Sequence, residues 1–286
     1  MPIGGDAPHA RESLMSACRQ LGDEDEILVV LDRVTVELRQ ELTQIAHECG
    51  RSLRVLECRG EGITDALITG CDAARGEFIF RLDGDDFMLP GRVEKQLDAF
   101  LRYPKAVAIG GQAQIIDELG KIQGNTGMPL YDWQIRAHLR FSNPMIHPAI
   151  AYRTEALRLV GGYARDQKLA QDFDLAIRLT SAGHLINLSD VLIAYRIHSK
   201  QISNSRSQER VAYVAKALQH ANKGRLSGSS ALKISGLISD PGDTPKMLRA
   251  FTLFASKRPI TAGLILISRV ITLSMNRWLD LRRRGK

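Results

Sequence analysis

The sequence is poor in cysteine and lacks the features of an exported protein. Its four cysteines in 286 residues show no CxxC spacing, so neither a zinc site nor a disulfide framework is expected, and the thiols are expected to be reduced and mostly buried. The first ten residues have no basic segment followed by an apolar one, so they do not resemble a signal peptide. These absences predict a cytoplasmic protein.

The sequence also lacks an apolar run long enough to cross a bilayer. The best candidate, residues 259–273, is short and contains Arg269. Residues 246–286 hold ten Lys or Arg and a single Asp, a net charge of +9, so with +7 for the whole chain the first 245 residues carry −2. Because the basic charge is confined to the tail, nucleic acid is not expected as a partner. The tail has two interpretations: a peripheral amphipathic helix on the anionic cytoplasmic face of the inner membrane, or a helical cap packed on the domain.

What is present is an ordinary globular composition, 44% apolar and 25% charged, in which strand and helix patterns alternate. Strand patterns occur at residues 26–31, 53–56, 78–82, 106–116, 149–152 and 185–195, and helical spacing at 11–21, 36–49, 62–74, 92–102, 133–140, 154–160, 171–182 and 211–222. This alternation predicts an α/β fold, with a mostly parallel sheet flanked by helices. The pattern changes after residue 203, so we expect one domain over residues 1–205 and a basic helical C-terminal extension over residues 206–286.

Three carboxylates follow directly on one of these strands. Asp83, Asp85 and Asp86 come after the apolar run at residues 78–82, where the carboxyl end of a parallel strand opens onto a ligand site. Partial burial of such a triple negative charge is costly unless a cation compensates it. Hard oxygen ligands suit Mg²⁺ or Mn²⁺, which often also hold phosphate oxygens. The cluster therefore predicts a metal and phosphate site at the end of a strand.

Other interpretations of this cluster fit less well. An Asp-Gly pair is also typical of an ordinary turn. A calcium-binding EF-hand loop that starts at Asp83 fails because Phe87 takes a ligand position and Met88 stands where glycine is needed. A phosphohydrolase with an aspartate nucleophile is a third interpretation, but such a nucleophile usually follows the first strand, and this strand is at least the third.

Further candidates lie at strand and helix ends. Asp172 opens the helix at residues 171–182, where it either stabilises the helix dipole or acts as a general base near the metal and phosphate site. Asp174, two residues further on, points elsewhere and is expected to be structural. His147 lies between two prolines, and its predicted role is either a packed loop residue or a contact to the substrate. His198 follows a strand, and its predicted role is either structural or that of a metal ligand. Asp32 ends the strand at 26–31, as a turn residue or a contact to a nucleotide base or sugar.

In this order, these pieces resemble the family 2 glycosyltransferases, which have the GT-A fold. The resemblance covers about residues 2–205, and its ordered motifs are far more specific than an Asp-x-Asp pair alone. The matching stretches are residues 73–79 running into 81–86, then 89–96, 143–148, 161–163, 171–175 and 195–198.

The resemblance implies an inverting transfer of a sugar from a nucleotide-sugar donor to a hydroxyl of a polysaccharide or lipid-linked acceptor. Asp172 is similar to the catalytic base of the family. The resemblance also implies that Asp83 and Asp85, with His198 beside them, bind a divalent cation, Mg²⁺ or Mn²⁺. The residues that it implies for donor binding are Asp32, Arg81, Asp83, Asp85 and His147.

Three departures from the family pattern define an alternative. The first strand is expected to be missing or cut short, since residues 1–5 begin at about the turn that normally follows it. An acidic pair after the strand at 26–31 is reduced to Asp32. Gln171 stands where the family usually has Glu, so it keeps hydrogen-bonding capacity but loses charge. The alternative prediction is a nucleotide-sugar-binding member with weak or no turnover.

Overall fold

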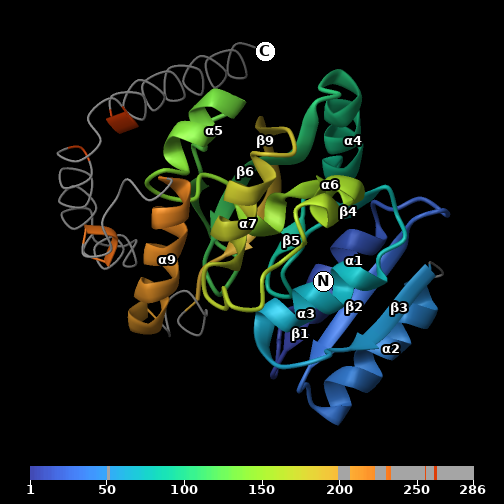
Figure 1. Ribbon diagram of the computed structural model, residues 1–286. Helices are drawn as coiled ribbons and strands as arrows, with labels where there is room; N and C mark the ends of the chain where they lie inside the picture. Colours follow the sequence, from blue (N-terminus) through green and yellow to red (C-terminus); the bar gives the residue numbers. More distant parts are fainter. Residues whose placement is uncertain (50–51, 199–206, 223–229, 233–254, 256–260, 263–286) are drawn as a thin grey trace.

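We describe the protein from a computed structural model, which covers residues 1–49, 52–198, 207–222, 230–232, 255 and 261–262 (Figure 1). Most of the basic tail, including all but residues 261–262 of the predicted membrane-surface helix within residues 259–273, lies outside these described residues. Among the described helices, none is both long and apolar enough to cross a membrane.

The N-terminal part is a three-stranded parallel sheet with the order β1-β2-β3, formed by β1 (Pro2–Gly4), β2 (Glu26–Asp32) and β3 (Ser52–Glu57). Successive side chains of β2 point to opposite faces of the sheet, and both faces are covered by helices. Val29 joins the apolar cluster with residues of α1 (Ala10–Cys18) and α2 (Val36–Cys49), whereas Val30 meets Gly70 of α3 (Gly62–Ala73) on the other face. The first strand is thus present, with three residues in register with the end of β2.

The second sheet has six strands and is mixed. Its order is β4-β8-β6-β9-β5, with β7 paired to β6; the strands are β4 (Phe78–Phe80), β5 (Phe87–Met88), β6 (Ala106–Ile116), β7 (Ile122–Asn125), β8 (Ala151–Arg153) and β9 (His184–Arg196). The long central pair β6–β9 is parallel, and the others are antiparallel. The α/β class and the parallel first sheet agree with the sequence. The second sheet was not expected, because it holds only one parallel pair, and β4 ends before Arg81.

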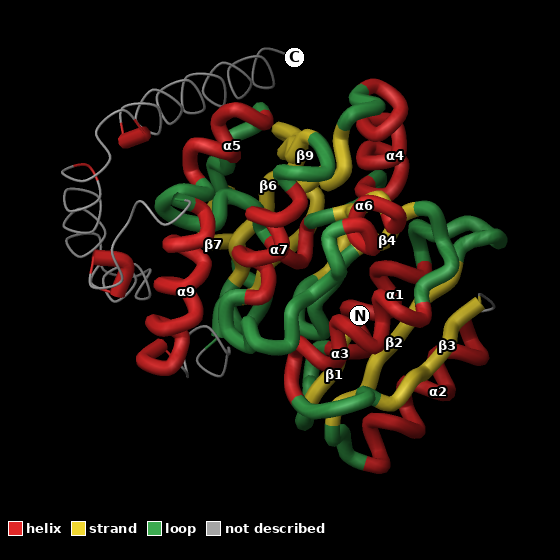
Figure 2. Tube along the Cα trace, viewed as in Figure 1, coloured by secondary structure: helices red, strands yellow, loops and turns green. Residues whose placement is uncertain are grey.

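Helices cover this second sheet, as Figure 2 shows. They are α4 (Arg92–Arg102), α5 (Asp132–His138), α6 (Thr154–Leu159), α7 (Gln171–Leu179) and α9 (Ser207–Ala221), with the 3-10 turn η1 at His147–Ala149. The main apolar core contains Phe173 and Leu175 of α7 together with Leu218 of α9. The start of the predicted C-terminal extension therefore packs on the domain that precedes it.

The cysteines differ from expectation at one position. Cys58 and Cys71 have free thiols, as predicted, but Cys18 is disulfide-bonded. The prediction of reduced thiols is wrong there because motif spacing detects only cysteines close in sequence. Cys18 ends α1, a helix that packs against α2, and such a contact between elements leaves no CxxC pattern.

Candidate active site

One cavity of about 940 Å³ brings most of the predicted site residues together. Its wall includes the loop after β4, the loop before η1, the first turn of α7 and the end of β9. The predicted residues among its lining are Asp83, Asp85, His147, Asp172 and His198. Segments that lie far apart in the sequence thus contribute to one site.

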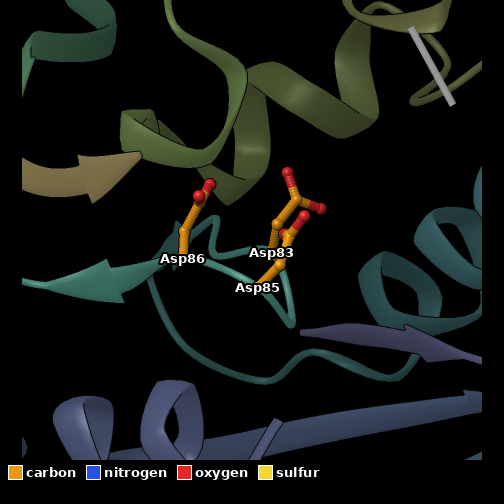
Figure 3. A group of neighbouring side chains, drawn as sticks. All are labelled: Asp83, Asp85 and Asp86. Carbon is orange, nitrogen blue, oxygen red and sulfur yellow. The ribbon is translucent and has the colours of Figure 1, made fainter. Parts of the chain in front are cut away.

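The aspartate cluster forms one part of this wall. One carboxylate oxygen from each of Asp83, Asp85 and Asp86 lies within 4.8 Å of the others. In Figure 3 the carboxylates of Asp83 and Asp85 lie beside each other, whereas Asp86 stands apart. His198 Nε2 lies 2.9 Å from Asp85 Oδ2. Burial, and then the charge of Asp83, raise the pKa of Asp85. The donor set fits Mg²⁺ or Mn²⁺.

Asp86 has a different role from its two neighbours, because it is 1% exposed and does not line the cavity. Its Oδ1 accepts a hydrogen bond from Arg196 N at 2.8 Å. The Arg196 guanidinium donates to the Asp85 carbonyl at 3.2 Å and to Glu12 Oε2 at 2.9 Å. Arg196 therefore braces the aspartate loop against the end of β9.

Arg81 is not on the cavity wall, although the resemblance implied that it binds the donor. Its side chain is 5% exposed and is ion-paired with Asp83 Oδ1. Its carbonyl accepts a hydrogen bond of 2.7 Å from Arg92 Nη2, and Arg92 is fully buried at the start of α4. Arg81 thus orients Asp83 from a buried position outside the cavity lining. A direct contact between Arg81 and the donor stays a prediction.

Asp172 lies in the first turn of α7 and lines the cavity. Its Oδ2 accepts a hydrogen bond of 3.0 Å from Asn143 Nδ2. Asp174 is buried and paired with Arg178 at 2.8 Å, which confirms its structural role. Asp172 is therefore the first-turn carboxylate of α7 that faces the cavity.

His147 begins the 3-10 turn and is held by an aromatic neighbour. Its Nε2 lies 2.7 Å from the Tyr163 hydroxyl, and the two rings meet edge to face. Burial, and then the charge of Arg81, lower the pKa of His147 to about 3. The imidazole is neutral at ordinary pH, so it can donate or accept one hydrogen bond but cannot supply a positive charge.

Asp32 lies at the carboxyl end of β2, as expected, but outside the cavity lining. Its Oδ2 accepts a hydrogen bond of 2.8 Å from Gly62 N. Gly62 has φ +84°, a conformation that glycine adopts without strain at the start of α3. In this arrangement Asp32 caps the turn into α3, and its contact to a nucleotide stays a prediction.

Sequence reasoning missed four residues of the site and its support: Arg92, Asn143, Lys168 and Arg210. Arg92 and Asn143 were inside matched motifs but had no role assigned. Lys168 and Arg210 are the only Lys or Arg side chains among the described residues of the cavity wall. Arg210 comes from α9, beyond the motifs, so no sequence signal pointed to it.

The fold and this site define a class of enzyme, and comparison with known proteins agrees. Residues 2–160 match the family model of "Glycosyl transferase family 2". The chain is 30% identical over 197 residues to the amylovoran biosynthesis glycosyltransferase AmsE of Erwinia amylovora, covering 68% of this chain and 73% of AmsE. It is 31% identical over 201 residues to an uncharacterized glycosyltransferase of Haemophilus influenzae, covering 68% and 72%.

Solved structures show the same fold at low sequence identity. TarS 1–349 of S. aureus in complex with UDP-GlcNAc has a TM-score of 0.62 at 15% identity, covering 100% of this chain and 91% of that one. This chain spans 49% of a longer TarS structure. The mannosyltransferase PcManGT of Pyrobaculum calidifontis with GDP-Man and Mn²⁺ has a TM-score of 0.58 at 18% identity, covering 97% and 86%. The protein belongs to glycosyl transferase family 2 and has the GT-A fold of its glycosyltransferases.

Proposed function

We propose that the protein is a metal-dependent, inverting glycosyltransferase that moves a sugar from a nucleotide-sugar donor to a hydroxyl of a polysaccharide or lipid-linked acceptor. The observation that carries this proposal is that one cavity is lined both by Asp83 and Asp85, beside His198, and by the separate carboxylate Asp172. A cation site and a general base are the two elements that such a transfer needs.

The chain's own residues divide the work of this reaction. Asp83 and Asp85, with His198 next to Asp85, would hold Mg²⁺ or Mn²⁺, which when bound neutralises the charge that grows on the leaving nucleoside diphosphate. Asp172 accepts the proton of the acceptor hydroxyl, whose oxygen attacks the anomeric carbon from the face opposite the leaving group. That attack inverts the configuration of the sugar. Arg81 and Arg92 keep Asp83 in place from behind the wall.

Two further side chains support binding of an anionic donor. Among the described residues, five carboxylates line the cavity wall, and the only Lys or Arg side chains there are Lys168 and Arg210. These two are therefore the residues of the wall that could attract the negative phosphates of a donor. Arg210 forms no ion pair with any described residue, and α9 is held in place by buried side chains such as Leu218 in the main apolar core. We therefore propose that Arg210 contributes positive charge to the diphosphate of the donor.

The named relatives support the choice of acceptor class. AmsE is named for amylovoran biosynthesis, and WbnJ of Escherichia coli, 31% identical over 130 residues, for O-antigen biosynthesis. For this chain, transfer to a polysaccharide or to a lipid-linked saccharide in the cytoplasm is a proposal by analogy. Attachment of the basic tail to an anionic membrane surface is a separate proposal, supported by its net charge of +9.

A screen with nucleoside diphosphates tests this function. The thermal midpoint is measured with UDP, GDP, ADP, CDP and dTDP, each with Mn²⁺, Mg²⁺ or EDTA. We expect one nucleotide to raise the midpoint with a metal and not with EDTA, and the matching nucleotide sugars to release sugar slowly to water. Metal-dependent binding without any turnover supports the alternative, a binding member of the family. Covalent phosphorylation of Asp83 would instead indicate a phosphohydrolase.

A further inference from the structure

Asn143 and Asp172 meet at the cavity wall through a hydrogen bond between their side chains. Asn143 lies in the loop between α5 and η1, and Asp172 lies in the first turn of α7; both line the cavity. Asn143 Nδ2 donates to Asp172 Oδ2 at 3.0 Å. Among the described residues, Asn143 is the only hydrogen-bond donor to this carboxylate.

The orientation of the Asn143 amide is fixed by a second hydrogen bond. Met145 N donates to Asn143 Oδ1 at 3.2 Å. Because an N–H group requires an acceptor, the amide oxygen must face Met145 and the NH₂ group must face Asp172. Met145 itself is 4% exposed, so this loop is anchored in the core. Pro144 further restricts the backbone of Asn143 to extended conformations.

We propose that Asn143 is a positioning residue for the catalytic base. It holds Oδ2 of Asp172, which fixes the rotation of the carboxylate and leaves Oδ1 to accept the proton of the acceptor hydroxyl. The inference rests on the proposed function, since it needs Asp172 to be the base. A base that is free to rotate spends less time in the reactive geometry, so the loss of Asn143 slows the chemical step.

Two variants separate this role from a structural one. Asn143→Asp is isosteric: its carboxylate still accepts the hydrogen bond from Met145 N, but it replaces the NH₂ donor that faces Asp172 with an oxygen. Asn143→Ala removes both hydrogen bonds. Ser142→Ala is the control, because Ser142 is adjacent, does not line the cavity and has no side-chain hydrogen bond within the described structure.

The experiment measures kcat, the KM for the donor and the affinity for the nucleoside diphosphate. We expect both Asn143 variants to lose at least about tenfold in kcat, the effect of one lost hydrogen bond to a charged group. Donor KM and nucleotide affinity change less than about twofold, and Ser142→Ala matches the wild type. If Asn143→Asp keeps wild-type kcat while Asn143→Ala loses it, Asn143 only shapes the loop and the inference is wrong. An increase in donor KM at unchanged kcat would overturn the inference as well.

Asp172→Asn, measured in parallel, separates this inference from the proposed function. If Asp172→Asn retains turnover, or if the wild type transfers no sugar, the proposed function fails and takes the inference with it. If Asp172→Asn is inactive while both Asn143 variants turn over like the wild type, only the inference fails.

Discussion

His198 Nε2 lies 2.9 Å from Asp85 Oδ2, although the two residues are 113 positions apart in the sequence. The contact joins the end of β9 to the loop after β4, and Arg196 N reinforces it through a hydrogen bond to Asp86. Because two segments of chain meet there, the proposed metal site depends on the folded sheet as well as on the local Asp-x-Asp motif.

The two cavity-lining aspartates should control metal-dependent nucleotide binding. We expect Asp83→Asn and Asp85→Asn each to weaken Mn²⁺-dependent binding of the nucleoside diphosphate by at least about tenfold, because each removes one charged oxygen ligand from the cation. Isothermal titration with and without Mn²⁺ measures this. Asp98→Asn is a matched control, since Asp98 is exposed on α4 and does not line the cavity. Wild-type affinity in both aspartate variants would contradict the assignment.

Arg210 should matter for the phosphates of the nucleotide and not for its base. We expect Arg210→Ala to weaken binding of the nucleoside diphosphate by about tenfold, the effect of losing one charge-assisted hydrogen bond, and to leave the weak binding of the nucleoside unchanged. Arg210→Lys should recover part of the loss. Arg102→Ala removes the same charge from an exposed position on α4 outside the cavity. Equal affinity in the Arg210 and Arg102 variants would contradict a phosphate contact.

His147 should make the fold sensitive to acid. Its pKa falls from an ordinary 6.5 to about 3 in the folded protein, chiefly through burial. Between these values the unfolded chain binds a proton that the folded protein does not, so the stability present above pH 6.5 is lost as the pH falls toward 3. We expect the thermal midpoint of His147→Gln to fall less than that of the wild type between pH 7 and pH 5. The exposed His184→Gln variant serves as the control, and identical slopes for wild type and His147→Gln would refute the prediction.

The sequence allowed the fold class and the aspartate cluster to be predicted because both are local patterns. A glycine-opened apolar run that ends in Asp83, Asp85 and Asp86 is visible without any tertiary information. His198 follows a distant strand, and the sequence left open whether it is structural or a metal ligand. The structure places its Nε2 2.9 Å from Asp85 Oδ2, and its role as a metal ligand stays a prediction.

The rest required the tertiary structure. A charged residue next to a metal motif is expected at the surface, yet Arg81 is buried and paired with Asp83 from behind the wall. The hydrogen bond from Asn143 to Asp172 spans 29 positions and leaves no periodic signal. Arg210 reaches the cavity only because α9 packs on α7, which the pattern of a separate extension did not indicate.

The most direct test of Asp172 as the general base is to measure sugar transfer by Asp172→Asn, together with the affinity of this variant for the nucleoside diphosphate in Mn²⁺. The substitution keeps the size of the side chain and removes its ability to accept the acceptor's proton. We predict a loss of at least about 100-fold in transfer, the usual share of a general base, with nucleotide affinity within about twofold of the wild type. Transfer at the wild-type rate by Asp172→Asn would contradict the role of Asp172 as the catalytic base.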